Sequence, residues 1–302
     1  MTRTVDFYLR PRTIRQLTDG TGHRFYSRAM TAFESIGLQV NLIDDSNDIR
    51  KESLFAPCFA LFDHKVPIHD LSLDVRRTAI GPFYRMEKSP IRAKYRLVDR
   101  PFCPADIPAQ KAQSFFRIWQ KLIVKPKTTE ASGVVLVALQ GQLLARRSQQ
   151  AVSPVDMIRA TMAHEKDRQI WLKLHPKESY SVDELAAIAQ FASDPRVTVF
   201  DGDLDTALHA CDYIVTQNSS VVLRGLFYQR PAIVFADCEF HHPFKSVRRG
   251  VPVAAAFDTV MTDQPDFAAF AYWYLQLNCI NTSREWVEEM ILTQCREFGW
   301  DI

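Results

Sequence analysis

Short apolar runs alternate with helix-like segments in the second half of the chain, and this alternation limits the possible folds more than any other feature. The unbroken apolar run 134–139 is typical of a strand that is buried on both faces. Further apolar runs follow at 170–174, 197–200, 213–215 and 232–235, with a helix-like segment between successive runs. Strands that alternate with helices at this spacing predict a parallel, doubly wound sheet.

The first half of the chain predicts a second α/β unit. Apolar runs at 5–9, 38–43 and 55–62 are expected to form strands, with a helix over 24–36 between the first two. The segment 64–110 contains six prolines, so long helices are not expected there.

A polar segment separates these two patterns. Residues 125–132 interrupt the apolar periodicity and predict an interdomain linker. We therefore expect one domain over residues 1–128 and another over residues 129–302. The last part of the chain, 267–298, is expected to be mostly helical.

Composition excludes several classes of protein. The chain has 302 residues but only 10 glycines, and it contains neither a Walker-type phosphate loop nor a G-x-G-x-x-G motif. Lys and Arg number 37 and Asp and Glu 35, and a net charge of +2 does not indicate a nucleic-acid-binding protein. Basic residues are concentrated in 76–100, a segment that suits an anionic ligand or membrane surface or, equally, a solvated, salt-bridged face.

Cysteine spacing and hydropathy give further expectations. None of the six cysteines forms a C-x-x-C pair, so neither a zinc site nor a redox motif is predicted. No signal peptide is evident, and no apolar run approaches the ~18 residues needed to span a bilayer. We expect a cytoplasmic protein that contacts a membrane at most peripherally.

Polar residues follow every strand predicted in the second half. Ligands bind at the carboxyl ends of the strands in open α/β sheets. The hydroxyl residues that precede the helix after 213–215 suit a phosphate, because helix N-termini present free N–H groups. A histidine at a strand end is more often simply solvated, and Asn-Ser-Ser is more often only a helix cap, so the argument depends on their combination at one edge. The expected donor phosphate site consists of Gln140, His175, Pro176, Gln217, Asn218, Ser219 and Ser220.

Two of these motifs carry a family resemblance. Leu174-His-Pro176, and later the run 212–235 with its Ser-Ser turn, helix and step into the next strand, resemble the capsule polysaccharide biosynthesis glycosyltransferases, which are related to bacterial retaining β-Kdo transferases. The resemblance covers roughly residues 134–245. Arg230 stands where the family has a glycine before the proline. The stretch 80–87 is similar to the aromatic-acidic segment near that family's active site.

The resemblance implies a GT-B-like α/β fold, with two Rossmann-like domains facing a cleft. The domain 1–128 would then lie on the acceptor side, and 129–302 would hold the nucleotide-sugar, with its C-terminal helices packing back on the first domain. The implied reaction transfers a sugar, such as Kdo from CMP-Kdo, to an anionic bacterial surface glycan or glycolipid. It requires no metal and no cofactor beyond the CMP-sugar substrate. Peripheral contact with the inner membrane would fit such an acceptor.

Retention of configuration requires a carboxylate nucleophile. Glu87 and Asp99 are the candidates, because both lie among basic residues that would keep them ionised. Asp70, Asp74 and Asp106 are weaker candidates. Equally, Glu87 and Asp99 could serve only as ion-pair partners of neighbouring Arg and Lys.

Two alternative functions stay open. The chain could be a non-catalytic sugar-nucleotide-binding or assembly protein with the same fold. It could also be a metal-dependent hydrolase that uses His241 and His242 with Asp237 and Glu239. Two adjacent histidines make a poor metal pair, however, because side chains alternate in direction along a strand.

Overall fold

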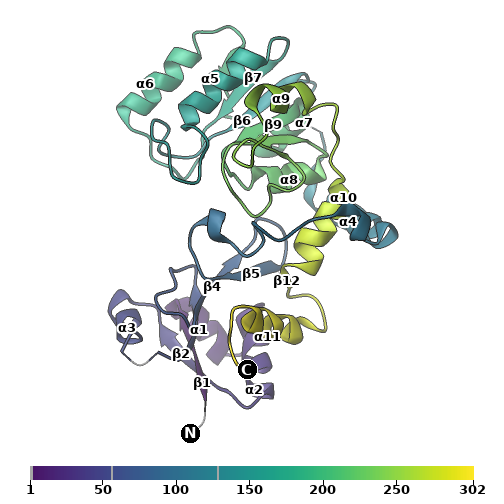
Figure 1. Cartoon of the computed structure of the whole chain (residues 1–302). Coiled ribbons are helices and arrows are strands. Elements are labelled where there is room, and N and C mark those ends of the chain that lie inside the picture. Colours follow the sequence, from purple (N-terminus) through teal and green to yellow (C-terminus); the bar gives the residue numbers. More distant parts are fainter. Residues whose placement is uncertain (1–2, 56, 128) are drawn as a thin grey trace. The chain divides into compact units, whose positions relative to one another are not determined.

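The computed structural model describes residues 3–55, 57–127 and 129–302. The chain forms two compact units, each built on its own sheet (Figure 1). The first unit combines Met1–Arg96 with Tyr274–Ile302, and the second is Leu97–Trp273.

The sheet of the second unit confirms the predicted parallel arrangement. Its six strands are all parallel and lie in the order β11-β10-β9-β6-β7-β8. This is the 3-2-1-4-5-6 order of a Rossmann sheet. The strands are β6 (Val134–Ala138), β7 (Gln169–Lys173), β8 (Val197–Val199), β9 (Cys211–Thr216), β10 (Ala232–Val234) and β11 (Lys245–Ser246).

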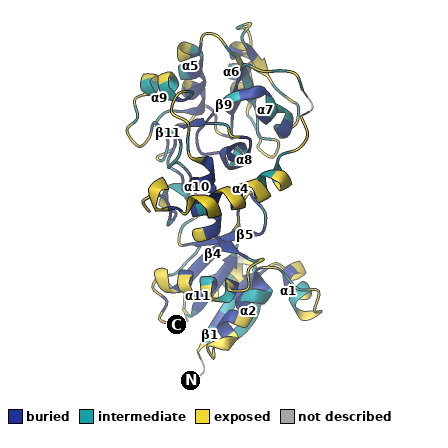
Figure 2. Cartoon of the chain, turned by 90° about the vertical axis from the view of Figure 1, so that its right-hand side faces the viewer, coloured by how far each residue is buried: buried dark blue, intermediate teal, exposed yellow. Residues whose placement is uncertain are grey.

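Helices with well-formed N-termini connect these strands. Ser153 caps its helix by accepting a hydrogen bond from the Asp156 N–H (3.2 Å), and Ser181 and Glu184 form a reciprocal capping box. The central strands β6, β9 and β10 and most of α8 are buried, whereas one face of α4 is exposed (Figure 2). The helices are α4 (Ala109–Ile123), α5 (Pro154–His164), α6 (Val182–Phe191), α7 (Leu204–Ala210), α8 (Val221–Phe227), α9 (Val253–Thr259) and α10 (Phe267–Ala271).

The first unit has a mixed sheet in the order β12-β5-β4-β3-β1-β2. Strands β2, β1, β3 and β4 are parallel, while β5 and β12 are antiparallel to their neighbours. β4 and β5 were not predicted, because they lie in the proline-rich segment. Pro67, Pro82 and Pro90 fall outside both strands, so they exclude helices without disrupting the sheet. The strands are β1 (Thr4–Leu9), β2 (Gln39–Asp44), β3 (Phe59–Asp63), β4 (Ser72–Arg77), β5 (Phe83–Glu87) and β12 (Ile280–Asn281).

The C-terminal segment completes the core of the first unit. Val287 and Ile291 of α11 are fully buried, and α11 packs against α2. The Trp300 ring stacks on Phe59 with 4.6 Å between the ring centroids. The helices of this unit are α1 (Pro11–Thr18), α2 (Tyr26–Ser35), α3 (Asn47–Glu52) and α11 (Val287–Glu297).

The boundaries of the compact units differ from the predicted division at residues 128 and 129. α4 belongs to the second unit, where Phe116 stacks on Phe227 of α8 with 5.3 Å between the ring centroids. Asp99 likewise belongs to the second unit. The chain leaves the first unit after Arg96 and returns to it at Tyr274.

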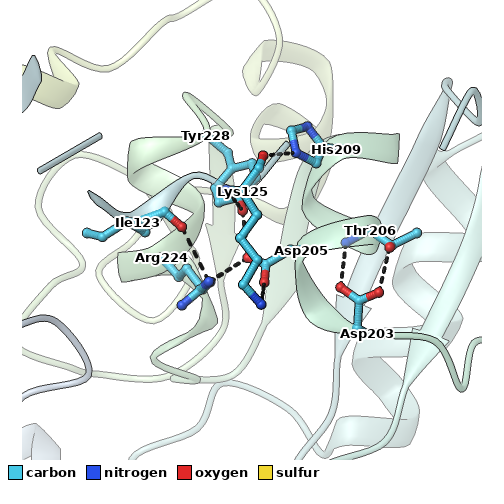
Figure 3. Close-up of polar contacts among 8 residues, drawn as sticks. All are labelled: Ile123, Lys125, Asp203, Asp205, Thr206, His209, Arg224 and Tyr228. Carbon is cyan, nitrogen blue, oxygen red and sulfur yellow. Dashed lines mark hydrogen bonds and ion pairs between the residues drawn. The ribbon is translucent and has the colours of Figure 1, made fainter. Parts of the chain in front are cut away.

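A buried carboxylate holds the start of the predicted linker, Lys125, to the second unit. Asp205 of α7 accepts hydrogen bonds from Arg224 (2.6 Å) and Tyr228 (2.5 Å), and it forms an ion pair with Lys125 (2.8 Å; Figure 3). The His209 ring also bonds the Lys125 carbonyl at 2.8 Å. The end of α4 is thereby held to α7 and α8.

Candidate functional site

The sheet of the second unit changes direction between β6 and β9. From β6 the chain builds outward through β7 and β8, and it then crosses to β9 on the other side of β6. Ligands of such sheets bind outside the carboxyl ends of the strands at this switch point. The Thr216 hydroxyl, at the end of β9, donates a hydrogen bond to the carbonyl of Ala138, at the end of β6 (2.7 Å). The two strand ends are therefore held side by side.

The turn after β9 buries an unusual amount of polar surface. Gln217 is 2% exposed and Ser219 5%, and Asn218 is also buried. The Gln217 Nε2 donates to the Val152 carbonyl at 3.1 Å, whereas its Oε1 has no hydrogen-bond partner among the described residues. The buried Oε1 of Gln140, just beyond β6, likewise has no partner in the described part of the chain. Leaving a buried acceptor unpaired costs about 1–3 kcal/mol, so a ligand that donates to these oxygens would be stabilised.

Ser219 and Ser220 lead into α8, as the sequence predicts. The Ser219 hydroxyl accepts a hydrogen bond from the Val221 N–H at 3.3 Å. Ser220 is the N-cap residue, but its side chain makes no capping hydrogen bond. α8 has only seven residues, and the Ser220 hydroxyl at its N-terminus is not used in capping.

His175 lies two residues beyond β7 and is half-buried, while Pro176 is exposed. Its Nδ1 accepts a hydrogen bond from the Lys177 N–H at 3.2 Å. With Nδ1 acting as the acceptor, the ring hydrogen of His175 lies on Nε2, which makes Nε2 a donor. A phosphate oxygen is a suitable acceptor for this group.

The loops after β6 and β7 lie in close contact. A Cβ atom added at Gly141 would lie 2.5 Å from the Glu178 Oε2, so only glycine fits there without movement of Glu178. This contact brings the Gln140–Gly141 loop against the loop that carries His175. Glu178 and Thr216 were not among the predicted site residues. Thr216 is the last residue of β9, and Glu178 lies in the loop after β7.

The two predicted nucleophiles lie in different compact units. Glu87, at the end of β5, is 2% exposed, and its Oε2 accepts the Arg96 N–H at 2.9 Å. The Asp99 side chain is 82% exposed and pairs with Arg249 at 2.9 Å. Arg249 also bonds Asp237, which follows β10, at 2.7 Å. Asp99 is therefore linked to the carboxyl edge of the second sheet through an arginine that no sequence motif indicated.

His241 and His242 hold the same segment of chain as Asp99. Their rings stack with 4.1 Å between centroids, and their Nε2 atoms bond the carbonyls of Val98 (3.0 Å) and Arg100 (2.9 Å). The expectation that they point apart is wrong, because they lie in a turn rather than a strand. Burial lowers the pKa of both rings, that of His242 to about 4, so both are neutral at pH 7. Within residues 3–55, 57–127 and 129–302, no three His, Cys, Asp or Glu side chains are grouped to hold a metal ion.

Comparison with known proteins gives a result at the level of the fold. No protein-family model matches the chain, and no curated protein matches its sequence. The structure is similar to that of Thermosulfurimonas dismutans KpsC, described as a beta Kdo 2,7 transferase, with a TM-score of 0.51, 13% identity, and coverage of 98% of this chain and 99% of that one. The TM-score is 0.49 for the KpsC beta Kdo 2,4 transferase of the same organism, with 12% identity and coverage of 90% of both chains. It is 0.39 for S. aureus MnaA with UDP, with 10% identity and coverage of 99% of this chain and 97% of that one.

The similarity with the TM-score of 0.51 establishes the fold class. The chain has a GT-B-like α/β fold with two Rossmann-like sheets. No helix in the described part of the chain combines the length and apolar character needed to cross a membrane.

Proposed function

We propose that the chain is a glycosyltransferase whose nucleotide-sugar donor binds at the carboxyl edge of the second sheet. The observation that carries this proposal is the buried polar turn 217–220 at the β6–β9 switch point of a Rossmann-order sheet. The His175 Nε2–H and the Ser220 hydroxyl would bind the donor phosphate, and Gln140 and Gln217 would accept hydrogen bonds from the nucleotide.

The proposed donor is a CMP-sugar such as CMP-Kdo. Support comes from the resemblance of residues 174–176 and 212–235 to the capsule glycosyltransferases, and from the fold shared with a protein described as a Kdo transferase. The acceptor in this proposal is an anionic bacterial surface glycan or glycolipid. We also propose a cytoplasmic location with peripheral contact at the inner membrane, where such an acceptor would be met.

The proposed mechanism is a double displacement. A carboxylate attacks the anomeric carbon as its bond to the phosphate oxygen breaks, and CMP leaves with the electron pair. The acceptor hydroxyl then displaces the carboxylate and loses its proton to a base or to water. Asp99 is the better candidate nucleophile, because its side chain is accessible, whereas Glu87 is buried against the Arg96 N–H.

A panel of nucleotides tests the donor. CMP should raise the thermal midpoint without added metal and more than UDP, GDP or NAD does. A ligand at 100 times its dissociation constant adds about 2.7 kcal/mol of stability, which is readily detected. Equal stabilisation by NAD, or a strict requirement for Mg²⁺, would contradict the proposal.

Turnover distinguishes the enzyme from a binding protein. Release of CMP from CMP-Kdo should be abolished in Asp99→Asn while CMP affinity is unchanged, and Glu87→Gln serves as the comparison. Activity retained in both variants would show that the nucleophile lies elsewhere.

Both carboxylates already have partners in the structure, which favours a non-catalytic sugar-nucleotide-binding protein as the second candidate. CMP binding without turnover by the wild-type chain would support that alternative.

A further inference from the structure

The first unit contains a polar cavity of about 300 Å³ that the proposed function does not use. It is lined by side chains from the loop after β1, the start of α1, the loop before α2, and the ends of β3 and β4. The charged residues and histidines among them are Arg10, Arg12, His23, Asp63, His64 and Arg77.

The topology of the first sheet marks this cavity as a ligand position. β2 and β3 lie on opposite sides of β1, so the direction of the sheet changes between β1 and β3. Arg10 directly follows β1, and Asp63 is the last residue of β3. The cavity therefore lies at the carboxyl-end switch point of this sheet, which is the usual place of a ligand in an open α/β fold.

Positive charge exceeds negative charge in this cavity. Three arginines face one carboxylate, Asp63. Asp63 Oδ2 lies 3.7 Å from Arg10 Nε, and its Oδ1 accepts a hydrogen bond from the Tyr26 hydroxyl at 3.3 Å. Arg77 donates to the Gly81 carbonyl at 3.2 Å. Neither Arg12 nor Arg77 forms an ion pair with a carboxylate in the described part of the chain, so their charges are uncompensated.

His23 adds a neutral donor group, because burial lowers the pKa of its ring. His23 Nδ1 accepts the N–H groups of Phe25 and Tyr26 (3.3 Å each), which leaves the hydrogen on its Nε2. The backbone of His64 has a φ of 55°, in the left-handed region that residues other than glycine rarely adopt. Such a conformation is costly and is found preferentially at functional sites.

We propose that this cavity binds a sugar-sized ligand through its carboxylate or phosphate group. Guanidinium groups bind both oxyanions, frequently through two parallel hydrogen bonds. Asp63 would accept hydrogen bonds from the ligand's hydroxyl groups. A volume of about 300 Å³ is at the small end of the range for ligand sites. The inference uses residues of the first unit alone and does not depend on the proposed function.

Calorimetric titration of the full chain tests this inference. The probes are glucuronate, glucose 6-phosphate, inorganic phosphate and neutral glucose. We expect glucuronate or glucose 6-phosphate to bind at least about tenfold more tightly than glucose. The one with the higher affinity shows whether the cavity prefers a carboxylate or a phosphate group. Equal affinity for glucose and both anionic sugars, or no binding of either anionic sugar, would overturn the proposal.

Variants locate the site. Arg77→Gln and Arg12→Gln should each weaken binding of the anionic sugar about tenfold. Arg15→Gln is the matched control, since Arg15 lies on α1 and is exposed but does not line the cavity. An equal loss of affinity in Arg15→Gln, or no loss in Arg77→Gln and Arg12→Gln, would contradict the assignment.

Circular dichroism checks that each variant is folded. Unchanged CMP affinity in these variants separates loss of anionic-sugar binding from a failure of the donor site.

Discussion

Asp74 is a fully buried carboxylate in β4, opposite Glu87 in the antiparallel register with β5. The Arg76 guanidinium donates to its Oδ2, while its buried Oδ1 has no hydrogen-bond partner among the described residues. Burial raises the pKa of Asp74 to about 6, against the opposing effect of Arg76. This acid therefore stays protonated in the folded chain at a pH where it ionises in the unfolded chain.

The stability of the protein should consequently fall as this group titrates. Its favourable contribution is complete below the unfolded pKa of 3.8 and is lost as the pH rises through about 6. Between those limits the wild type should lose about 2–3 kcal/mol relative to Asp74→Asn, because one pKa unit corresponds to about 1.4 kcal/mol. Urea unfolding of both proteins across this pH range provides the measurement.

The exposed Asp70 provides the control for this experiment, since Asp70→Asn should show the pH dependence of the wild type. A difference between wild type and Asp74→Asn that does not change with pH would show that Asp74 is ionised in the folded state.

At the scale of elements, Asp205 joins α4, α7 and α8. Burial opposes its ionisation, but hydrogen bonds from Lys125, Tyr228 and Arg224 lower its pKa to about 2. Asp205→Ala leaves these donors without their shared acceptor and should reduce the free energy of unfolding by about 3 kcal/mol. Chemical denaturation at neutral pH measures this loss.

Asp203, two residues earlier, offers a matched control. It caps α7 by accepting a hydrogen bond from the Thr206 N–H at 3.0 Å (Figure 3). Asn caps helices as well as Asp does, so Asp203→Asn should be nearly neutral. Equal effects of the two substitutions would mean that the Asp205 network adds nothing beyond a helix cap.

Elements of the second unit were predictable because apolar strands and capped helices each carry a local signal. The capping box at Ser181 and the runs 134–139 and 170–174 all correspond to elements of the structure. By contrast, the two-residue strands β11 and β12 are too short to show a period. β4 and β5 were missed because their signal lies between prolines. α1 was missed because it closely follows β1 and its N-cap residue, Arg10, is not a capping residue type and makes no side-chain capping hydrogen bond.

At the scale of the whole molecule, the chain's final segment belongs to the unit in which the chain begins. The family resemblance implies that C-terminal helices pack on the first domain. The polar composition of residues 125–132 does not indicate this, because it depends on contacts between residues far apart in the sequence. Ile291 of α11 is fully buried in that core, so Ile291→Ala should lower the free energy of unfolding by about 2–5 kcal/mol.

Thr293, exposed on the same helix, is the control, and Thr293→Ala should change stability by less than about 0.5 kcal/mol. Guanidinium unfolding of both variants makes the comparison. A neutral Ile291→Ala would indicate that α11 does not contribute to the core of the first unit.

The candidate sites differ in how far sequence indicated them. The residues after β6, β7 and β9 were predictable, because a long apolar strand places the next polar residue at the sheet edge. The cavity of the first unit follows the same rule at Arg10 and Asp63. Its lining residues Arg77 and Tyr84, however, come from β4 and β5, two strands that the sequence did not predict. Arg249 reaches Asp99 and Asp237 from a turn, and no periodicity marks such a residue.

The central claim is that the carboxyl edge of the second sheet binds the donor nucleotide, and calorimetric titration with CMP tests it most directly. His175→Ala should weaken CMP binding about ten- to a hundredfold, since a hydrogen bond to a charged group contributes about 1.5–3 kcal/mol. Ser220→Ala should weaken it as well. His164→Ala, at an exposed histidine of α5, should bind as the wild type does. Unchanged CMP affinity in both His175→Ala and Ser220→Ala, with the wild type binding CMP, would contradict this account.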